Sequence, residues 1–189
     1  MRKLGILLSG RGSNFRAIFH AIQSGKLEAE IACVVSNVPA APGIRFAEEQ
    51  GLPAYALNSQ GIPRAQFDQQ VVRILRSHAV DLVCLAGYMR LLSPEFIDAY
   101  RNRILNIHPS LLPSFPGLHA QRQALEYGVK IAGCTVHLVD EGLDSGPILA
   151  QRAVPVLEGD TEDTLSARIL EQEHDVYPLA IVQVLARLD

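Results

Sequence analysis

The amino-acid sequence predicts a single α/β domain over residues 1–189, with an open, mostly parallel, twisted sheet and helices on both faces. The first observation behind this prediction is that short apolar runs alternate with segments of helical periodicity along the chain. The second is a glycine-rich turn between the first strand and the first helix. The third is that polar side chains gather where successive strands end, which is where open α/β sheets bind their ligands.

Composition argues against several classes of protein. The formal net charge is −3, so a nucleic-acid-binding surface is not expected. No apolar run approaches the ~20 residues that cross a bilayer, and the start of the chain lacks the apolar core of a signal peptide. Cys33, Cys84 and Cys134 lie in separate apolar runs without paired spacing, which indicates reduced core thiols rather than a metal site. We therefore expect a cytoplasmic protein that binds neither nucleic acid nor a membrane.

The first half of the chain alternates strand and helix. Leu4 to Leu8 is a continuous aliphatic run, as in a buried parallel strand, and apolar residues from Phe15 to Ile22 recur at helical spacing up to Gly25. Further along, the pattern predicts a strand over 30–35, a short helix over 44–50, a peripheral strand over 53–57 and an amphipathic helix over 64–77.

Residues 9–14 form the glycine-rich loop. Backbone N–H groups at the start of a helix lack intrahelical partners, and with the helix dipole they attract an anion. The loop is not a dinucleotide fingerprint, because Phe15 stands where the third glycine belongs. Since Gly10 and Gly12 alone are also typical of a structural turn, this pattern by itself is only weak support for a phosphate site.

The second half continues the alternation. The pattern predicts a central strand over 81–86, a helix capped by Ser93 with Pro94 at its first position, a strand over 104–108 and a helix over 119–127. It then predicts strands over 131–139 and 148–156, and a final helix from Thr161 that is capped by Asp160 and kinked near Pro178.

A pair of polar side chains ends one of these strands. The strand period of two sends Asn106 and His108 to one face, about 7 Å apart, and Leu105 and Ile107 to the other. Pro109 cannot donate to a sheet ladder, so the strand ends there. A single polar residue at a strand end is usually only a turn former or a hydrogen-bonded surface group. The pair on one face is what indicates a functional site.

The segment from Asn106 to Pro113, with Pro116–His119 following, resembles the signature of the folate-dependent formyltransferases. The resemblance extends from residue 4 to about residue 185 and implies a Rossmann-like formyltransferase domain. It also implies that Asn106 and His108 flank the formyl group during transfer, and that Asp144 completes a catalytic triad. On the residues alone, the acidic segment around Asp144 is a solvated surface loop.

The same resemblance implies two small-molecule substrates and no permanently bound cofactor or metal. The formyl donor is 10-formyltetrahydrofolate, a reduced folate used as a co-substrate, and the acceptor is phosphoribosylglycinamide of de novo purine biosynthesis. Residues 1–100 are expected to bind the phosphate, and residues 101–189 to bind the folate and carry the catalytic groups. The acceptor residues are Arg11, Gly12, Ser13, Asn14, Pro109 and Glu173. The folate residues are Arg64, Met89, Arg90, Leu91, Leu92, Asn106, Asp140, Glu141, Gly142, Leu143 and Asp144.

Several of these roles depend on the resemblance. Arg64 alone is typical of a solvated surface arginine, and Met89 is typical of a core residue unless it lines a pocket at the end of a strand. Alternation along strand 131–139 puts Thr135 and His137 on one face, and His137 is expected to support the site rather than to act in catalysis. Gln172 and His174, which flank Glu173, resemble the segment that reaches the acceptor.

Other readings remain open at this point. A serine hydrolase could use His108 and Asp144, but Gly-x-Ser-x-Gly does not occur and Ser13 lies one place off that pattern. A nucleotide-binding module without catalysis would not need the polar triad, and a formyltransferase or hydrolase acting on another acceptor would share it. Extra domains of relatives that act on tRNA or hydrolyse the folate are not expected. Leu170, polar in relatives, and the early carboxyl end leave the acceptor pocket and a homodimer open.

Overall fold

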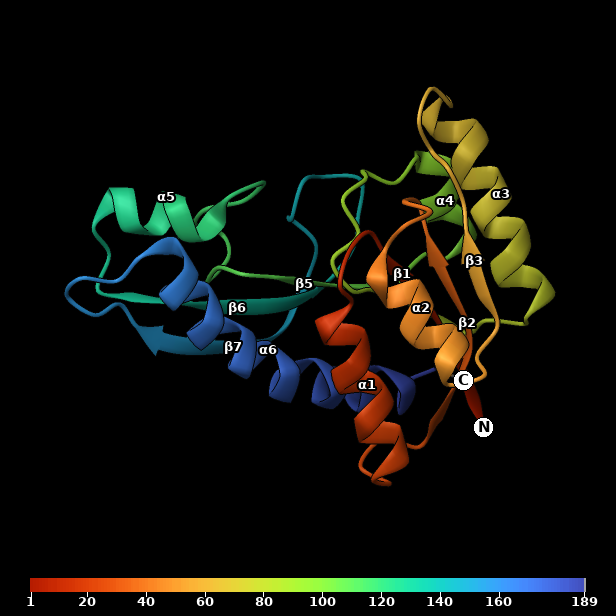
Figure 1. The fold of residues 1–189 in the computed structure, drawn as a ribbon, viewed down its shortest axis with the longest axis horizontal. Coiled ribbons are helices and arrows are strands. Elements are labelled where there is room, and N and C mark those ends of the chain that lie inside the picture. Colours follow the sequence, from red (N-terminus) through yellow and green to blue (C-terminus); the bar gives the residue numbers. More distant parts are fainter. Residues whose placement is uncertain (189) are drawn as a thin grey trace.

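The computed structural model describes residues 1–188 and contains a seven-stranded sheet flanked by helices (Figure 1). The strands are β1 (Arg2–Leu8), β2 (Ala29–Ser36), β3 (Ala54–Ala56), β4 (Leu82–Leu85), β5 (Ile104–His108), β6 (Ile131–Leu138) and β7 (Ile148–Pro155). The helices are α1 (Ser13–Gln23), α2 (Pro42–Glu49), α3 (Arg64–Ser77), α4 (Pro94–Ala99), α5 (Ala120–Tyr127) and α6 (Glu162–Leu185).

The sheet is parallel over most of its width. The strand order is β3-β2-β1-β4-β5-β6-β7, and every pairing from β3 to β5 is parallel. β6 pairs antiparallel with both β5 and β7. The mostly parallel sheet predicted from the sequence is therefore confirmed, as are the peripheral place of β3 and the central place of β4. Because β1, β4 and β5 are adjacent and parallel, the loops that follow them leave the same edge of the sheet.

Helices cover both faces of the sheet, each face over its own core. In β1, Leu4, Ile6 and Leu8 pack with α1, α2 and α6, whereas Leu7 on the opposite face packs with α3 and α4. Full burial of each such side chain contributes about 1.5–3 kcal/mol. The continuous apolar run of β1 is thus explained by burial on both sides.

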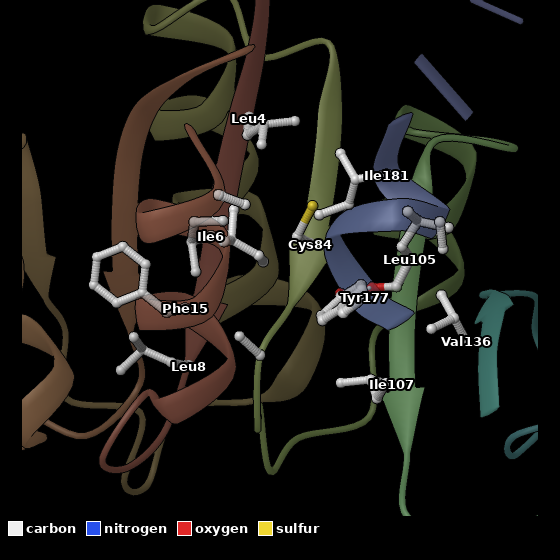
Figure 2. Packing of buried hydrophobic residues seen from close by; sticks show 14 of the residues in the cluster. Leu4, Ile6, Leu8, Phe15, Cys84, Leu105, Ile107, Val136, Tyr177 and Ile181 are labelled. Carbon is white, nitrogen blue, oxygen red and sulfur yellow. Dashed lines mark hydrogen bonds between the residues drawn. The ribbon is translucent and has the colours of Figure 1, made fainter. Parts of the chain in front are cut away.

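Tyr177 ties α6 to the centre of the sheet. Its side chain is fully buried in the core of the first face (Figure 2). The hydroxyl donates to the carbonyl oxygens of Leu85 and Leu105, which lie at 2.9 and 3.0 Å. Since these carbonyls belong to β4 and β5, the bond fixes α6 against the two strands whose ends carry the predicted site.

The start of α6 differs from the sequence prediction. The N-cap is Thr161, not Asp160, because Thr161 accepts from the backbone N–H of Thr164 and Thr164 bonds back in a capping box. Asp160 instead pairs with Arg168, at 2.7 Å. Pro178 lies inside the helix. Within residues 1–188, no helix is both long enough and apolar enough to span a membrane.

The three cysteines lie in the core, as their apolar surroundings in the sequence predict. Cys33, Cys84 and Cys134 are buried and free. Burial raises the pKa of the Cys33 thiol to about 12, so this group stays protonated at neutral pH. The prediction of reduced core thiols is therefore confirmed.

Candidate active site

Asn106 and His108 project from one face of β5, as the strand period predicts. Leu105 and Ile107 enter the core on the opposite face. Across the antiparallel ladder Asn106 faces His137, and His108 faces Thr135. Directly opposed residues share a face of the sheet. The predicted grouping of these polar side chains on one side is thus confirmed.

Asp144 reaches the two histidines from the loop between β6 and β7, which we call the acidic loop (residues 140–146). Its Oδ2 lies 3.4 Å from Nδ1 of His108, and its Oδ1 lies 3.8 Å from Nε2 of His137. The backbone N–H of Gly117 also donates to Oδ2, at 2.8 Å. Asp144 has φ 48, a left-handed backbone that is uncommon without glycine. The loop therefore holds an unusual conformation in which the carboxylate meets the imidazoles.

The ring of His108 is held at both nitrogens. Nε2 lies 2.9 Å from the carbonyl oxygen of Phe115, and since a carbonyl can only accept, Nε2 carries the proton. Nδ1 faces Asp144 and can donate to it only in the imidazolium form. His108 is also buried, with 5% of the residue's surface exposed. Asp144 therefore has the position of a counter-ion for a charged His108.

His137 orients the amide of Asn106. Burial lowers the pKa of His137, partly opposed by the Leu138 carbonyl and by Asp144. In the neutral ring Nδ1 donates to the Leu138 oxygen, at 2.9 Å, so Nε2 accepts from Nδ2 of Asn106, at 3.2 Å. The bond aims one N–H of the amide at His137 and leaves the other, with Oδ1, for a ligand. These contacts support the role predicted for His137, which stays a prediction.

The proline-rich loop (residues 109–117) is anchored by side chains of β6 and β7. The Oγ1 of Thr135 donates to the Ser110 carbonyl, at 2.7 Å, and accepts from the Leu112 N–H, at 3.0 Å. Gln151 adds a bond to the Leu112 carbonyl, at 2.9 Å. Sequence reasoning missed Gln151; its only signal is that a polar residue interrupts a strand. These anchors fix the loop that supplies the Phe115 carbonyl to the site.

Gly12 forms the N-cap of α1 with φ 70. A Cβ at this position would lie 3.3 Å from the Cα of Gly43, so space as well as backbone conformation favours glycine. The first helical bond runs from Arg16 N–H to the Gly12 carbonyl, at 2.9 Å. The amides of residues 13–15 therefore precede the intrahelical ladder and face outward from the helix start.

Asn14 and Glu173, two of the predicted acceptor residues, contact each other although they lie 159 positions apart in the sequence. Nδ2 of Asn14 donates to Oε2 of Glu173, at 2.7 Å. Burial raises the pKa of Glu173, and the bond from Asn14 partly offsets this. The glycine-rich loop and the middle of α6 therefore meet at a buried carboxyl.

The loop after β4 (residues 87–92) presents an apolar, open surface. Met89 and Leu91 are 67% and 60% exposed, and Leu143 of the acidic loop is 55% exposed. Arg90 lies over the ring of Phe67, with 4.8 Å to the centroid. Among residues 1–188, the backbone N–H groups of residues 90–92 have no protein hydrogen-bond partner. Such a strip offers apolar contact and backbone donors to a flat ring.

Two predicted residues stay apart from the polar cluster. Arg11 is exposed within the glycine-rich loop, and Arg64 is exposed at the first position of α3. Neither has a hydrogen bond to another predicted site residue within the described chain, so their contacts with a ligand stay predictions. A cavity of about 350 Å³ lies between α3 and α4 and is lined by Asp68 and Ser93. None of the predicted site residues lines it, so the loops at the carboxyl ends of the strands remain the candidate site.

Comparison with known proteins identifies similar chains. The family model described as "Formyl transferase" matches residues 2–181. A Bacillus subtilis protein named phosphoribosylglycinamide formyltransferase is 45% identical over 186 residues, which cover 98% of this chain and 95% of the relative.

Two further comparisons bear on fold and length. A crystal structure of glycinamide ribonucleotide transformylase 1 from Symbiobacterium toebii superimposes with a TM-score of 0.93 at 51% identity, covering 96% of this chain and 86% of that one. The trifunctional purine biosynthetic protein adenosine-3 of Drosophila melanogaster is 44% identical over 97% of this chain. The chain spans only 14% of that larger protein.

Proposed function

The chain belongs to the formyl transferase family, and on this premise we propose that it transfers the formyl group of 10-formyltetrahydrofolate to the primary amine of phosphoribosylglycinamide. The observation that carries the proposal is the convergence of three polar side chains, Asn106, His108 and Asp144, from β5 and the acidic loop. The folate is a co-substrate consumed in each turnover, and the reaction needs neither a metal nor a covalent enzyme intermediate.

The reaction proceeds by direct attack. The amine nitrogen of the acceptor forms a bond to the formyl carbon, and the carbonyl oxygen becomes an oxyanion in a tetrahedral intermediate. The intermediate collapses when the bond from carbon to N10 of the folate breaks. The attacking nitrogen loses a proton and N10 gains one, so the products are the formylated amine and tetrahydrofolate.

Asn106 and His108 are the groups that stabilise the oxyanion. The amide N–H of Asn106 that is not bonded to His137 is free to donate to it. His108 can donate once its Nε2–H exchanges the Phe115 carbonyl for the oxyanion. The Asn106 amide, which His137 already orients, can stabilise the developing charge without reorganisation, whereas His108 must first leave the Phe115 carbonyl. The buried, paired arrangement supports this role.

Asp144 stabilises the charged form of His108 and assists proton transfer. Its Oδ2, 3.4 Å from Nδ1, lies on the side of the ring away from the Phe115 carbonyl. At this distance the carboxylate can pair with the imidazolium when the ring carries the transferred proton. A carboxylate or a water that it binds can also carry the proton from the amine toward N10.

We assign the acceptor to the region where the glycine-rich loop meets α6. The amides of Ser13 and Asn14 at the start of α1 provide donors for a phosphomonoester, and Gly12 lets the backbone approach it. The buried carboxyl of Glu173, held by Asn14, provides an acceptor for a ribose hydroxyl or an amide. Arg11 and Pro109 are further acceptor contacts in the proposal.

The folate is assigned to the 87–92 loop and the acidic loop. The unpaired amides of residues 90–92 can bind the polar edge of a pterin, and Met89, Leu91 and Leu143 provide apolar contact. The exposed Arg64 suits a carboxylate on the distal part of the folate. The parallel strands deliver both substrates to one edge of the sheet, which brings N10 and the amine together.

The direct test is to mix the protein with 10-formyltetrahydrofolate and phosphoribosylglycinamide and to follow the formation of tetrahydrofolate and of the formylated amine. We expect both products in equal amounts, and none without the acceptor. Release of formate in the absence of the acceptor would identify a hydrolase instead. Binding of the phosphorylated acceptor without any turnover would identify a nucleotide-binding module.

A further inference from the structure

Ser9, which directly precedes Gly10, makes hydrogen bonds to both ends of the turn at the start of the 87–92 loop, Gly87 and Met89. Its backbone N–H donates to the carbonyl of Gly87, at 3.0 Å. Its Oγ accepts from the backbone N–H of Met89, at 2.7 Å. One residue therefore joins the start of the proposed acceptor loop to the start of the proposed folate loop.

The backbone explains why a side chain is needed at this point. The hydrogen-bond ladder between β1 and β4 continues one residue past the end of β4, where the Ala86 N–H donates to the Leu7 carbonyl, at 2.8 Å. Gly87 then has φ 76, a left-handed conformation that turns the chain away from β1. The N–H of Met89 consequently bonds to the Ser9 hydroxyl rather than to a backbone carbonyl.

Asn37 sets the direction of the Ser9 hydroxyl. A serine hydroxyl has one proton, and Ser9 donates it to Oδ1 of Asn37 at the end of β2, so its lone pairs are left for Met89. Asn37 is 8% exposed, and its Nδ2 reaches Oγ of Ser59, at 3.4 Å. The carbonyl of Ser59 in turn accepts from Nη1 of Arg90, at 3.5 Å. This chain of hydrogen bonds, which we call the relay, thus starts at Met89 and returns to Arg90, both in the 87–92 loop.

Resting on the proposed function, we propose that Ser9 and Asn37 are positioning residues that hold the 87–92 loop in the conformation that binds the folate. They contact neither substrate in this scheme. They act because Ser9 directly precedes Gly10 of the acceptor loop, so the same hydrogen bonds set the spacing between the two substrates.

The test compares variants in binding and kinetics. Ser9→Ala leaves the Met89 N–H without its acceptor, and loss of such a partner typically corresponds to a factor of about 10 in affinity. We expect the Kd for tetrahydrofolate and the KM for the formyl donor to rise about 10-fold. The Kd for ribose 5-phosphate, which probes the glycine-rich loop, should change less than 2-fold, roughly the limit of non-specific effects.

Asn37 provides a second pair of variants that leaves β1 untouched. Asn37→Ala removes the acceptor of the Ser9 proton and should reproduce the folate defect, whereas Asn37→Asp keeps an oxygen there and should bind tetrahydrofolate more tightly than Asn37→Ala. The matched control is Ser77→Ala, because the Ser77 hydroxyl only bonds to the Ile74 carbonyl at the exposed end of α3. This control should match the wild type.

Two outcomes would overturn the inference: unchanged tetrahydrofolate affinity in Ser9→Ala and Asn37→Ala, or an equal loss of affinity for both probes. The first would show that the relay does not position the loop, and the second would show a general loss of structure. Its failure is distinct from failure of the proposed function. Suppose that the wild type binds tetrahydrofolate, that Ser9→Ala weakens this binding, and that the wild type transfers no formyl group. This result would disprove the proposed function and leave the positioning role of Ser9 intact.

Discussion

The two halves of the candidate site use different parts of the chain for chemistry. In the parallel half, the glycine-rich loop and the 87–92 loop present mainly backbone N–H groups. In the antiparallel half, β5, β6 and the acidic loop present side chains, Asn106, His108, His137 and Asp144. Backbone donors bind a rigid anion or a flat ring, and side chains can exchange protons. The difference teaches that substitutions should affect binding in one half and turnover in the other.

The strongest test of this contrast is removal of the side chains of the antiparallel half. Asn106→Ala and His108→Ala should each lower kcat by about 10²–10³ or more, because each removes a donor used mainly in the transition state. The double variant should be little worse than the poorer single variant. Steady-state kinetics measure this, with His20→Ala on the exposed face of α1 as the histidine control. Wild-type turnover by either variant would disprove the assignment.

The parallel half should instead show its importance through the phosphate of the acceptor. An acceptor that lacks the 5′-phosphate should lose at least about 10²-fold in kcat/KM with the wild type, as expected for a few charge-assisted hydrogen bonds. Gly12→Val should abolish most of this discrimination and leave the affinity for tetrahydrofolate nearly unchanged. The measurement is a pair of specificity constants for each protein.

Gly25→Val is the matched control for that experiment. Gly25 also has a positive φ, 73, but a Cβ there meets no atom within 4 Å and the residue lies at the far end of α1. This variant should lose stability through its backbone conformation and still prefer the phosphorylated acceptor. Equal reaction of the two acceptors with the wild type would mean that the glycine-rich loop is only a structural turn.

A smaller effect is expected where a side chain acts through another. His137→Phe removes the acceptor that orients the Asn106 amide and should lower kcat by about 10-fold, with little change in either KM, because the donor is misplaced rather than lost. His137→Gln can still accept from the amide and should recover much of the activity. If the two variants are equally impaired, His137 does not act by orienting Asn106.

The smallest expected effect concerns the stability of the fold, and it tests how much the buried carboxyl of Glu173 lowers the free energy of unfolding. Because burial raises the pKa of Glu173, the folded state holds this proton more tightly than the unfolded state, so stability falls as pH rises through the folded pKa. Glu173→Gln removes the charge and keeps an acceptor for Asn14. Its melting temperature should exceed that of the wild type at pH 8, by roughly 2–4 °C for each kcal/mol gained.

The same variant separates stability from function. At pH 4, below the ordinary pKa of a glutamate, the carboxyl of Glu173 is mostly protonated in both states, so the two proteins should melt at nearly the same temperature. The affinity of Glu173→Gln for the acceptor should fall, because the proposed function uses the Glu173 carboxylate as a hydrogen-bond acceptor for this substrate. The stability that the buried carboxylate costs the free protein is then offset by its role in binding. A lower melting temperature for Glu173→Gln at pH 8 would contradict this account.

Local patterns in the sequence predicted most of the fold. The period of two in 104–108 put Asn106 and His108 on one face, and the continuous apolar run of 4–8 predicted a strand buried on both sides; both are confirmed. The cap of α6 was assigned to Asp160, one residue early, because Asp and Thr are both good caps. Only the geometry shows that Asp160 pairs with Arg168 instead.

By itself, the sequence determined the type of each element, the faces on which the alternating side chains of β5 and β6 lie, and the family of the chain. Those properties depend on backbone periodicity and on contiguous motifs, which are local. Only the tertiary structure decided that Glu173 meets Asn14 and that Ser9 holds Met89, and it alone gives the distance between Asp144 and His108, which the family resemblance had paired. Contacts between such distant residues depend on the order of the strands and on the docking of α6. Both follow from packing of the whole core, which no single stretch of the chain encodes.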